Sequence, residues 1–264
     1  MKLGNRLRDF VWLMRKLGRE SLETIRRPRR LRWLFSADAL RRQMRMLVRK
    51  DAPSRLVDKS LPWTKAPGEA RGLKRREFTN YADYVKLQRE KLSIIDLDYY
   101  DREFRCALKN RLRSLRFVVP GKSCVCLAAR IGTEVKAFTD LGLLAVGIDL
   151  NPGDGNQYVL HGDFHALQFA DSVVDIVYTN SLDHALELER LLSEVTRVLK
   201  DDGSFMVEAM KGTATPEEFG VYETLWWETV DSLIAAISKE GFELQQRSSF
   251  TYPWDGEQLV FSRV

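Results

Sequence analysis

Residues 123–134, with the sequence SCVCLAARIGTE, decide the fold. The small and apolar residues 123–127 predict a buried β-strand, and a helix is predicted to begin close to Gly132. Small residues in the turn between them let the main chain approach a ligand closely. A strand that passes through such a turn into a helix is typical of the first unit of a doubly wound α/β domain, whose ligand lies across the carboxyl ends of the strands.

Short apolar runs alternate with helical stretches through the rest of the chain. This alternation indicates stacked β-α-β units around a mostly parallel sheet. Strands are predicted at residues 123–127, 144–149, 158–161, 173–179, 203–209, 242–249 and 258–262. The link 151–157, with the sequence NPGDGNQ, is too short for a crossover helix, so a loop is expected there.

Further helices are predicted on both sides of the first strand. Asn80 is a plausible N-cap for a helix over 81–92, and Asp98 or Asp101 for a helix that ends near Arg113. The second of these is expected to turn Phe104, Leu108 and Leu112 inward. Apolar spacing predicts one more helix, whose core face consists of Tyr222, Trp226, Val230, Leu233 and Ile237.

Acidic and polar residues follow three of the predicted strands. Asp149 ends the second strand, 17 residues beyond Gly132, and is placed to accept hydrogen bonds from both hydroxyls of a ribose. Asp163 follows the third strand, where its carboxylate and the ring of Phe164 suit the amino group and the face of an adenine. The fourth strand leads to Asn180 at the same edge of the sheet.

In these features the chain resembles the class I S-adenosylmethionine-dependent methyltransferases, over about residues 120–264. Its segment 191–208, LLSEVTRVLKDDGSFMVE, is similar to the stretch that reads E…RVLkpGG in many of these enzymes. The resemblance implies a Rossmann-like sheet of order 3-2-1-4-5-7-6 with an antiparallel last strand, and S-adenosylmethionine as the cofactor. The cofactor-binding residues that it implies are Ala128, Ala129, Arg130, Gly132, Asp149, Leu150, Asp163, Phe164, Asn180 and Ser181.

The first loop departs from the family's pattern, in which an acid precedes three spaced glycines. The chain has Cys126, Ala128 and Arg130 at these positions and keeps only Gly132. A cation beside a sulfonium would be repelled, so the side chain of Arg130 is expected to turn toward the cofactor's carboxylate or outward. The missing glycines argue against a nicotinamide oxidoreductase and leave a non-catalytic cofactor-binding scaffold as an alternative.

Asp183 and His184 are the candidate catalytic residues. A histidine beside a carboxylate can act as a general base for a hydroxyl or an amine. The alternative is a histidine that packs or hydrogen-bonds locally, because alignment of the nucleophile with an activated methyl group can supply much of the rate. The group His161, Asp163 and His165 lacks a fourth ligand, so no metal site is expected.

Several aromatic residues near the carboxyl end of the chain are candidates for the rim of an acceptor pocket. Aromatic residues in loops also often close the edge of a core, and this alternative stays open. The candidates are Trp227, Phe250, Tyr252 and Trp254, together with Tyr99 and Tyr100.

The two halves of the chain carry opposite charges. Residues 1–116 hold 32 Lys and Arg against 14 Asp and Glu, a balance of +18, whereas residues 117–264 carry −13, which together give +5. Residues 1–50 predict basic amphipathic helices with aromatic residues among the arginines, which suits an anionic membrane surface. Docking on the chain's own acidic half, or on a nucleic acid, is the alternative.

Three cysteines without a paired spacing, and no long apolar run, indicate a cytoplasmic protein that can associate peripherally with a membrane. We expect a basic helical extension and linker over 1–76, capping helices over 77–119 and a catalytic domain over 120–264. The leading hypothesis is direct in-line methyl transfer to an oxygen or nitrogen of a non-nucleic-acid acceptor, such as a saccharide or a lipid-linked molecule. An RNA methyltransferase that uses the basic extension is the alternative.

Overall fold

The computed structural model describes residues 61–66, 72–91, 98–220 and 222–264, all of which belong to one unit that extends from Ser60 to Val264. The basic segment 1–60, with its predicted amphipathic helices, lies outside the described residues. None of the described helices has the length and apolar character needed to cross a membrane.

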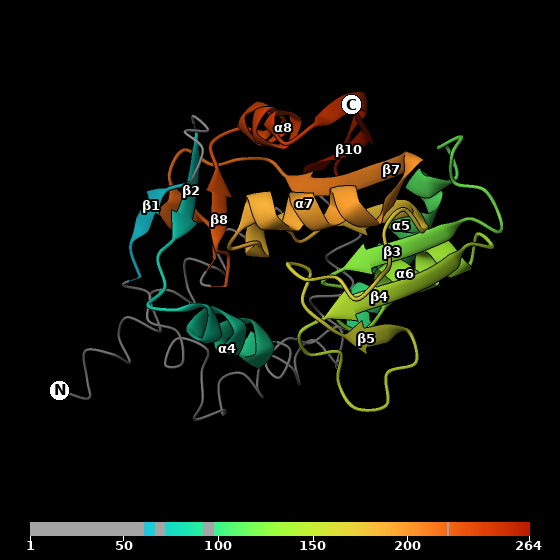
Figure 1. The fold of residues 1–264 in the computed structure, drawn as a ribbon, viewed down its shortest axis with the longest axis horizontal. Helices are drawn as coiled ribbons and strands as arrows, with labels where there is room; N and C mark the ends of the chain where they lie inside the picture. Colours follow the sequence, from blue (N-terminus) through green and yellow to red (C-terminus); the bar gives the residue numbers. More distant parts are fainter. Residues whose placement is uncertain (1–60, 67–71, 92–97, 221) are drawn as a thin grey trace, which may run out of the picture. The chain divides into compact units, whose positions relative to one another are not determined.

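A seven-stranded sheet forms the centre of this unit (Figure 1). Its strands are β3 (Ser123–Leu127), β4 (Leu144–Asp149), β5 (Val159–His161), β6 (Val174–Thr179), β7 (Leu199–Met210), β9 (Phe242–Phe250) and β10 (Gly256–Arg263). They lie in the order β5-β4-β3-β6-β7-β10-β9, which is 3-2-1-4-5-7-6 in chain order, and β10 is antiparallel to both of its neighbours. The predicted α/β class and strand order are therefore confirmed.

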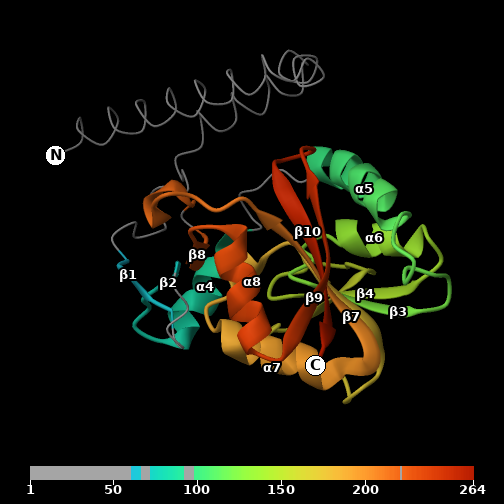
Figure 2. The same cartoon turned by 90° about the horizontal axis from the view of Figure 1, so that it is seen from above.

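Helices cover both faces of this sheet (Figures 1 and 2). One face carries α5 (Asp98–Leu112) and α6 (Thr133–Thr139), and the other carries α7 (Leu188–Val198) and α8 (Val230–Lys239). Strand β3 serves both cores, because successive side chains of a strand point to opposite faces. Cys124 and Cys126 lie in the α5/α6 core, whereas Val125 and Leu127 lie in the core on the α7 side.

Two predictions about the helices agree with the structure: the N-cap of one and the buried face of another. Helix α4 (Tyr81–Lys91) is capped as predicted, since the backbone N–H of Asp83 donates to Asn80 Oδ1 at 3.0 Å. In α5, the three residues expected to face inward are fully buried: Phe104, Leu108 and Leu112.

The link between β4 and β5 contains no helix, as its length predicted. Asn156 holds this loop with both ends of its amide group. Its Nδ2 donates to the carbonyl oxygens of Pro152 at 2.8 Å and Arg130 at 3.2 Å, and its Oδ1 accepts from the backbone N–H groups of Tyr158 and Val159. The loop is thus tied to the turn that follows β3.

A second, antiparallel sheet was not predicted. It consists of β1 (Trp63–Lys65), β2 (Leu73–Arg76) and β8 (Leu225–Trp227), in the order β1-β2-β8. Two of these strands, β1 and β2, lie within residues 1–76, which were expected to form a basic helical extension and a linker. The predicted helix that included Tyr222 and Trp226 is also wrong, because β8 occupies this stretch and α8 begins only at Val230.

Arg76 shows why local sequence did not reveal this sheet. Its buried guanidinium lies 4.4 Å from the ring centroid of Trp63 and donates to the carbonyl oxygens of Gly220 and Glu223. The partners that stabilise Arg76 are Trp63, which is near in sequence, and residues 220 and 223, which are far from it. Residue periodicity carries no information about such distant pairs.

Candidate functional site

Asp149 lies at the carboxyl end of β4, at the edge of the sheet where a cofactor was predicted. Its Oδ2 accepts a hydrogen bond from the backbone N–H of Arg130, and its Oδ1 accepts one from the backbone N–H of Asn151, each at 2.8 Å. A carboxylate oxygen accepts more than one hydrogen bond, so both oxygens retain capacity for a ribose hydroxyl. The side chain is positioned by the main chain and remains partly accessible.

The loop after β3 keeps a glycine-like backbone although two of its residues are not glycine. Ala128, Arg130 and Gly132 have φ angles of 52°, 49° and 83°, all in the left-handed region. At Gly132, which begins α6, a Cβ atom would lie 2.6 Å from Cβ of Tyr158. The absence of a side chain at Gly132 therefore lets the loop pack closely against Tyr158, and the loop carries backbone strain at the other two positions.

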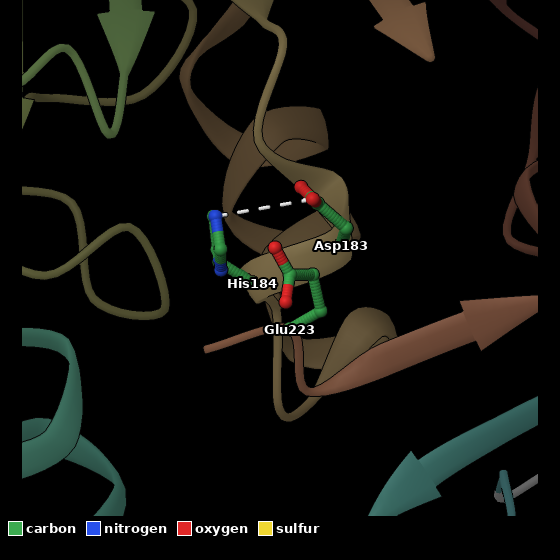
Figure 3. Close-up of side chains that lie close together, drawn as sticks. All are labelled: Asp183, His184 and Glu223. Atoms are coloured by element: carbon green, nitrogen blue, oxygen red, sulfur yellow. Dashed lines mark ion pairs between the residues drawn. The ribbon is translucent and has the colours of Figure 1, made fainter. Parts of the chain in front are cut away.

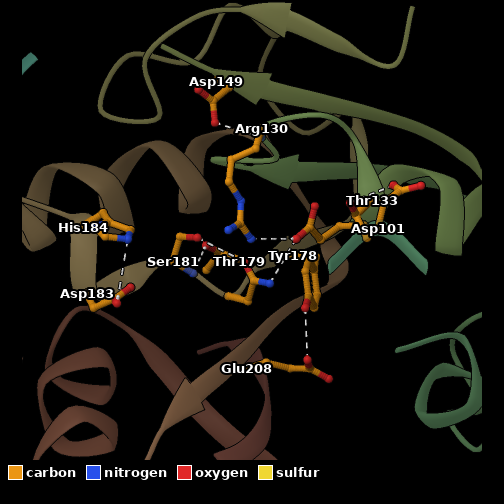
Figure 4. A network of polar contacts seen from close by, with 12 residues as sticks. Asp101, Arg130, Thr133, Asp149, Tyr178, Thr179, Ser181, Asp183, His184 and Glu208 are labelled. Atoms are coloured by element: carbon orange, nitrogen blue, oxygen red, sulfur yellow. Dashed lines mark hydrogen bonds and ion pairs between the residues drawn. The ribbon is translucent and has the colours of Figure 1, made fainter. Parts of the chain in front are cut away.

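The side chain of Arg130 turns inward rather than outward. Its Nη2 lies 3.3 Å from Oε1 of Glu134, whose side chain is 2% exposed. Asn180 Nδ2 donates to the same oxygen at 3.0 Å. Figure 4 shows the side chain of Arg130 extending away from Asp149 toward Ser181, which follows β6. Sequence reasoning missed Glu134.

Asp163 is held by residues from two different parts of the chain. Its Oδ2 accepts from the hydroxyl of Tyr81 in α4 at 2.6 Å, and its Oδ1 lies 3.0 Å from Nδ1 of His165. The Nε2 of His165 accepts from the backbone N–H of Glu187, so Nδ1 carries the proton and donates to Asp163. Burial opposes ionisation of Asp163, but these hydrogen bonds outweigh it and lower the pKa of its carboxyl group.

The other predicted residues around the cofactor site lie as follows. Ala129 is buried in the α5/α6 core, and Phe164 is buried in the core on the α7 side, with only 7% of the residue exposed. Leu150 is partly exposed at the end of β4. Ser181 is buried and its hydroxyl donates to Asn180 Oδ1 at 3.0 Å.

The two candidate catalytic residues lie in the short helix η4 (Leu182–His184), directly after β6. His184 Nδ1 lies 3.0 Å from the carbonyl oxygen of Tyr222, and because a carbonyl only accepts, Nδ1 carries the proton. His184 Nε2, which then has a lone pair, lies 3.8 Å from Oδ2 of Asp183. The structure therefore brings the predicted pair together in the tautomer that a general base at Nε2 requires.

Two segments close over this pair. From α4, the hydroxyl of Tyr84 donates to the carbonyl oxygen of His184 at 3.0 Å, and Gln88 Nε2 donates to the carbonyl oxygen of Tyr222 at 2.8 Å. From the segment before β8, the backbone N–H of Thr224 donates to the carbonyl oxygen of Asp183. The side chains of His184 and Asp183 are 12% and 13% exposed as a result.

Glu223 joins the pair and was missed by sequence reasoning. Figure 3 shows its carboxylate beside the side chains of Asp183 and His184. One ligand-type atom from each of the three residues lies within 4.8 Å of the other two. The chain segment that carries Glu223 is fixed by Arg76, and no local pattern in the sequence marks it.

Where the structure describes the candidate aromatic residues, each has a contact within the fold. Trp227 is buried and its Nε1 donates to the carbonyl oxygen of Met210 at 3.1 Å. Trp254 stacks on Phe104 with ring centroids 4.8 Å apart. Tyr252 is hydrogen-bonded to Glu103. The side chains of Tyr99 and Tyr100 lie outside the described part.

The residues at this edge fit an adenosine-containing cofactor. Asp149 offers two accessible oxygens for the ribose, and Asp163 is an ionised acceptor for an adenine amino group. The backbone of 128–132 leaves no side-chain bulk at Gly132. The nicotinamide alternative lacks its glycine fingerprint here.

The comparisons with known proteins agree with the predicted resemblance to methyltransferases. Residues 125–207 match the family described as "Methyltransferase domain". The Burkholderia thailandensis 1,6-didemethyltoxoflavin-N1-methyltransferase, solved with S-adenosylhomocysteine, has a TM-score of 0.58 at 12% identity, covering 76% of this chain and 100% of that one. A Pyrococcus horikoshii OT3 protein has a TM-score of 0.52 at 19% identity, covering 66% and 99%. No match to a curated protein sequence was found.

At these identities the two solved structures show the fold, and the matched family shows the kind of domain. Residues 125–207 form a methyltransferase domain, and the described part of the chain has the fold of the class I S-adenosylmethionine-dependent methyltransferases.

Proposed function

We propose that the chain transfers a methyl group to an oxygen or nitrogen of a small, non-nucleic-acid acceptor, with saccharides and lipid-linked molecules as the first candidates. The observation that carries this proposal is the enclosure of Asp183 and His184, whose side chains are 13% and 12% exposed beneath α4 and the segment before β8. A site so enclosed suits a small acceptor group better than a folded RNA. The Burkholderia enzyme named above was solved with a small heterocyclic acceptor.

Different residues of the site would serve different parts of the reaction. When bound, S-adenosylmethionine would supply an activated methyl group for direct transfer to the acceptor. Asp149 and Asp163 would hold its adenosine part, and the loop 128–132 would lie beside its methionine part. His184 Nε2 takes the acceptor's proton, and the carboxylate of Asp183 stabilises the imidazolium that results.

The basic segment 1–50 is proposed to bring this site to an anionic membrane surface from the cytoplasmic side. We propose the extension 1–76, the capping segment 77–119 and the catalytic segment 120–264 as functional divisions. The support for the surface role is the balance of +18 in residues 1–116.

The test is methyl incorporation from radiolabelled S-adenosylmethionine by the full chain. Small-molecule extracts, lipid-linked saccharides and total RNA are offered in parallel, with anionic and neutral vesicles added. We expect labelled product in a small-molecule or lipid fraction and stronger binding to anionic vesicles. Label found only in RNA, with RNA binding that falls steeply as salt rises, would replace this proposal with RNA methylation. Cofactor binding without labelled product in any fraction would favour the scaffold alternative.

A further inference from the structure

We propose that Asp183, His184 and Glu223 form a binding site for one divalent metal ion. Sequence spacing does not predict this site, because Glu223 lies 39 residues beyond His184 along the chain. In the structure the three side chains come from η4 and from the segment before β8 and face one another (Figure 3).

The spacing of the ligand atoms fits one ion. An imidazole nitrogen and two carboxylate oxygens, one atom from each residue, lie within 4.8 Å of one another. Protein nitrogen and oxygen ligands lie about 2.0–2.2 Å from zinc, so two ligands of one ion are separated by at most about 4.4 Å. The observed limit of 4.8 Å exceeds this separation by about 0.4 Å, so binding would need only small movements of the side chains.

The orientation of His184 is that of a metal ligand. Its Nδ1–H donates to the carbonyl oxygen of Tyr222 at 3.0 Å, which leaves the lone pair on Nε2 facing Asp183. Metal-binding histidines usually donate their second ring N–H to a carbonyl or a carboxylate, which fixes the ring and its tautomer. The other two histidines are engaged elsewhere: His161 with Arg89, and His165 with Asp163 and Tyr81.

A buried oxygen of Glu223 gives independent support. Its Oε2 is shut off from solvent and has no hydrogen-bond partner in the described structure. A carboxylate oxygen in that position is costly, because burial removes its hydration without replacing it. The carboxylate lies against Gly220, where a Cβ atom would be 2.3 Å from Oε2. Arg76 is close enough for its charge to interact with this carboxylate, but it donates its hydrogen bonds to backbone carbonyl oxygens of the segment rather than to Oε2.

The donor set indicates the class of ion and what it does. One imidazole with two carboxylates suits Mn²⁺ or Zn²⁺, and neither buried thiol of β3 belongs to the cluster. Resting on the proposed function, a bound ion would take an oxygen of the acceptor as a further ligand and lower the pKa of the acceptor's hydroxyl, whose proton would then leave to solvent water. His184 would act as a ligand in that state, and the metal charge would replace the imidazole as the group that promotes loss of the proton.

The experiment uses Mn²⁺ and the full chain without acceptor. Titration followed by electron paramagnetic resonance measures bound and free Mn²⁺, and pulsed measurements detect ¹⁴N coupling from a coordinated imidazole. The variants are Glu223→Gln and His184→Gln, and the matched controls are Glu218→Gln and His161→Gln, which remove exposed groups outside the cluster. Cofactor affinity, measured by calorimetry, shows that each variant is folded.

We expect one bound Mn²⁺ with ¹⁴N coupling in the wild type. Affinity should fall by at least about tenfold in Glu223→Gln, and the coupling should vanish in His184→Gln, while both controls behave as wild type. Absence of one-to-one binding in the wild type overturns the proposal, as does ¹⁴N coupling that persists in His184→Gln. If Mn²⁺ binds but no methyl transfer is detected, the result counts against the proposed function alone. If methyl transfer is detected but Mn²⁺ does not bind, the result counts against the metal site alone.

Discussion

The guanidinium of Arg130 lies 3.3 Å from Oε1 of Glu134, and this ion pair joins the loop after β3 to the first turn of α6. Asn180 donates to the same carboxylate oxygen from the end of β6. The cation therefore lies at the edge of the sheet where the methionine part of the cofactor is expected, and its present counter-ion is a buried carboxylate.

We predict that Arg130 exchanges Glu134 for the carboxylate of the bound cofactor. Arg130→Ala should weaken binding of S-adenosylmethionine about tenfold, the size of one charge-assisted hydrogen bond. The same variant should bind decarboxylated S-adenosylmethionine as the wild type does. Calorimetry with both ligands makes the comparison. Tighter binding by Arg130→Ala would mean that the side chain obstructs the site instead.

A second prediction concerns Asp149. Asp149→Asn removes the charge that a ribose hydroxyl would donate to, so affinity for S-adenosylmethionine should fall about tenfold or more. Asp154→Asn, an exposed change in the following loop, is the matched control and should have no effect. Because Asp149 also accepts from two backbone amides, thermal unfolding of each variant must be measured. Unchanged affinity in a folded Asp149→Asn protein would remove the ribose role.

A third prediction separates backbone strain from packing in the same loop. Ala128 has a φ of 52°, whereas the neighbouring Ala129 is not among the residues with positive φ and is buried. Ala128→Gly should raise the free energy of unfolding by about 0.5–1 kcal/mol, because relief of strain exceeds the added freedom of the unfolded chain. Ala129→Gly should lower it by about 1 kcal/mol. Denaturant unfolding of both variants measures these changes. Equal changes in the free energy of unfolding would show that the backbone at Ala128 is not strained.

A fourth prediction concerns acid stability. Burial opposes ionisation of Asp175, yet hydrogen bonds from Ser123 and Lys200 lower the pKa of its carboxyl group from the ordinary 3.8 to about 2. This depressed pKa stabilises the fold fully above pH 3.8, and the contribution is lost as pH falls toward 2. Asp175→Asn should flatten the fall in stability across this range, as measured by urea unfolding. Asp202→Asn, an exposed control, should leave the profile unchanged.

The central sheet could be predicted because the sequence pattern that indicates each strand lies within that strand and its adjoining turns. Strands β3, β4 and β6 contain short apolar runs, and Asp149 and Asp163 lie at or just after the ends of strands that parallel topology places together. Asp183 and His184 were found in the same way, from their place directly after β6.

The remaining features depend on contacts between distant segments. Strands β2 and β8 pair although most of the described chain separates them in sequence. The buried Arg76, which bonds to the segment before β8, cannot be distinguished in the sequence from the many other basic residues of the first half. Glu223 likewise reads as an ordinary acid until that pairing brings it to His184. Tyr81 was expected only as the start of a helix, and its bond to Asp163 depends on where α4 lies.

Asn156 replaces part of what a crossover helix normally provides. In most doubly wound folds a packed helix keeps the second and third strands in register with the first loop; here one amide group bonds to the backbone on either side of it. These hydrogen bonds join the loop and the turn after β3 at the sheet edge where an adenosine ligand is predicted. A short connection of this kind can tolerate varied sequence elsewhere, provided that one carboxamide is kept.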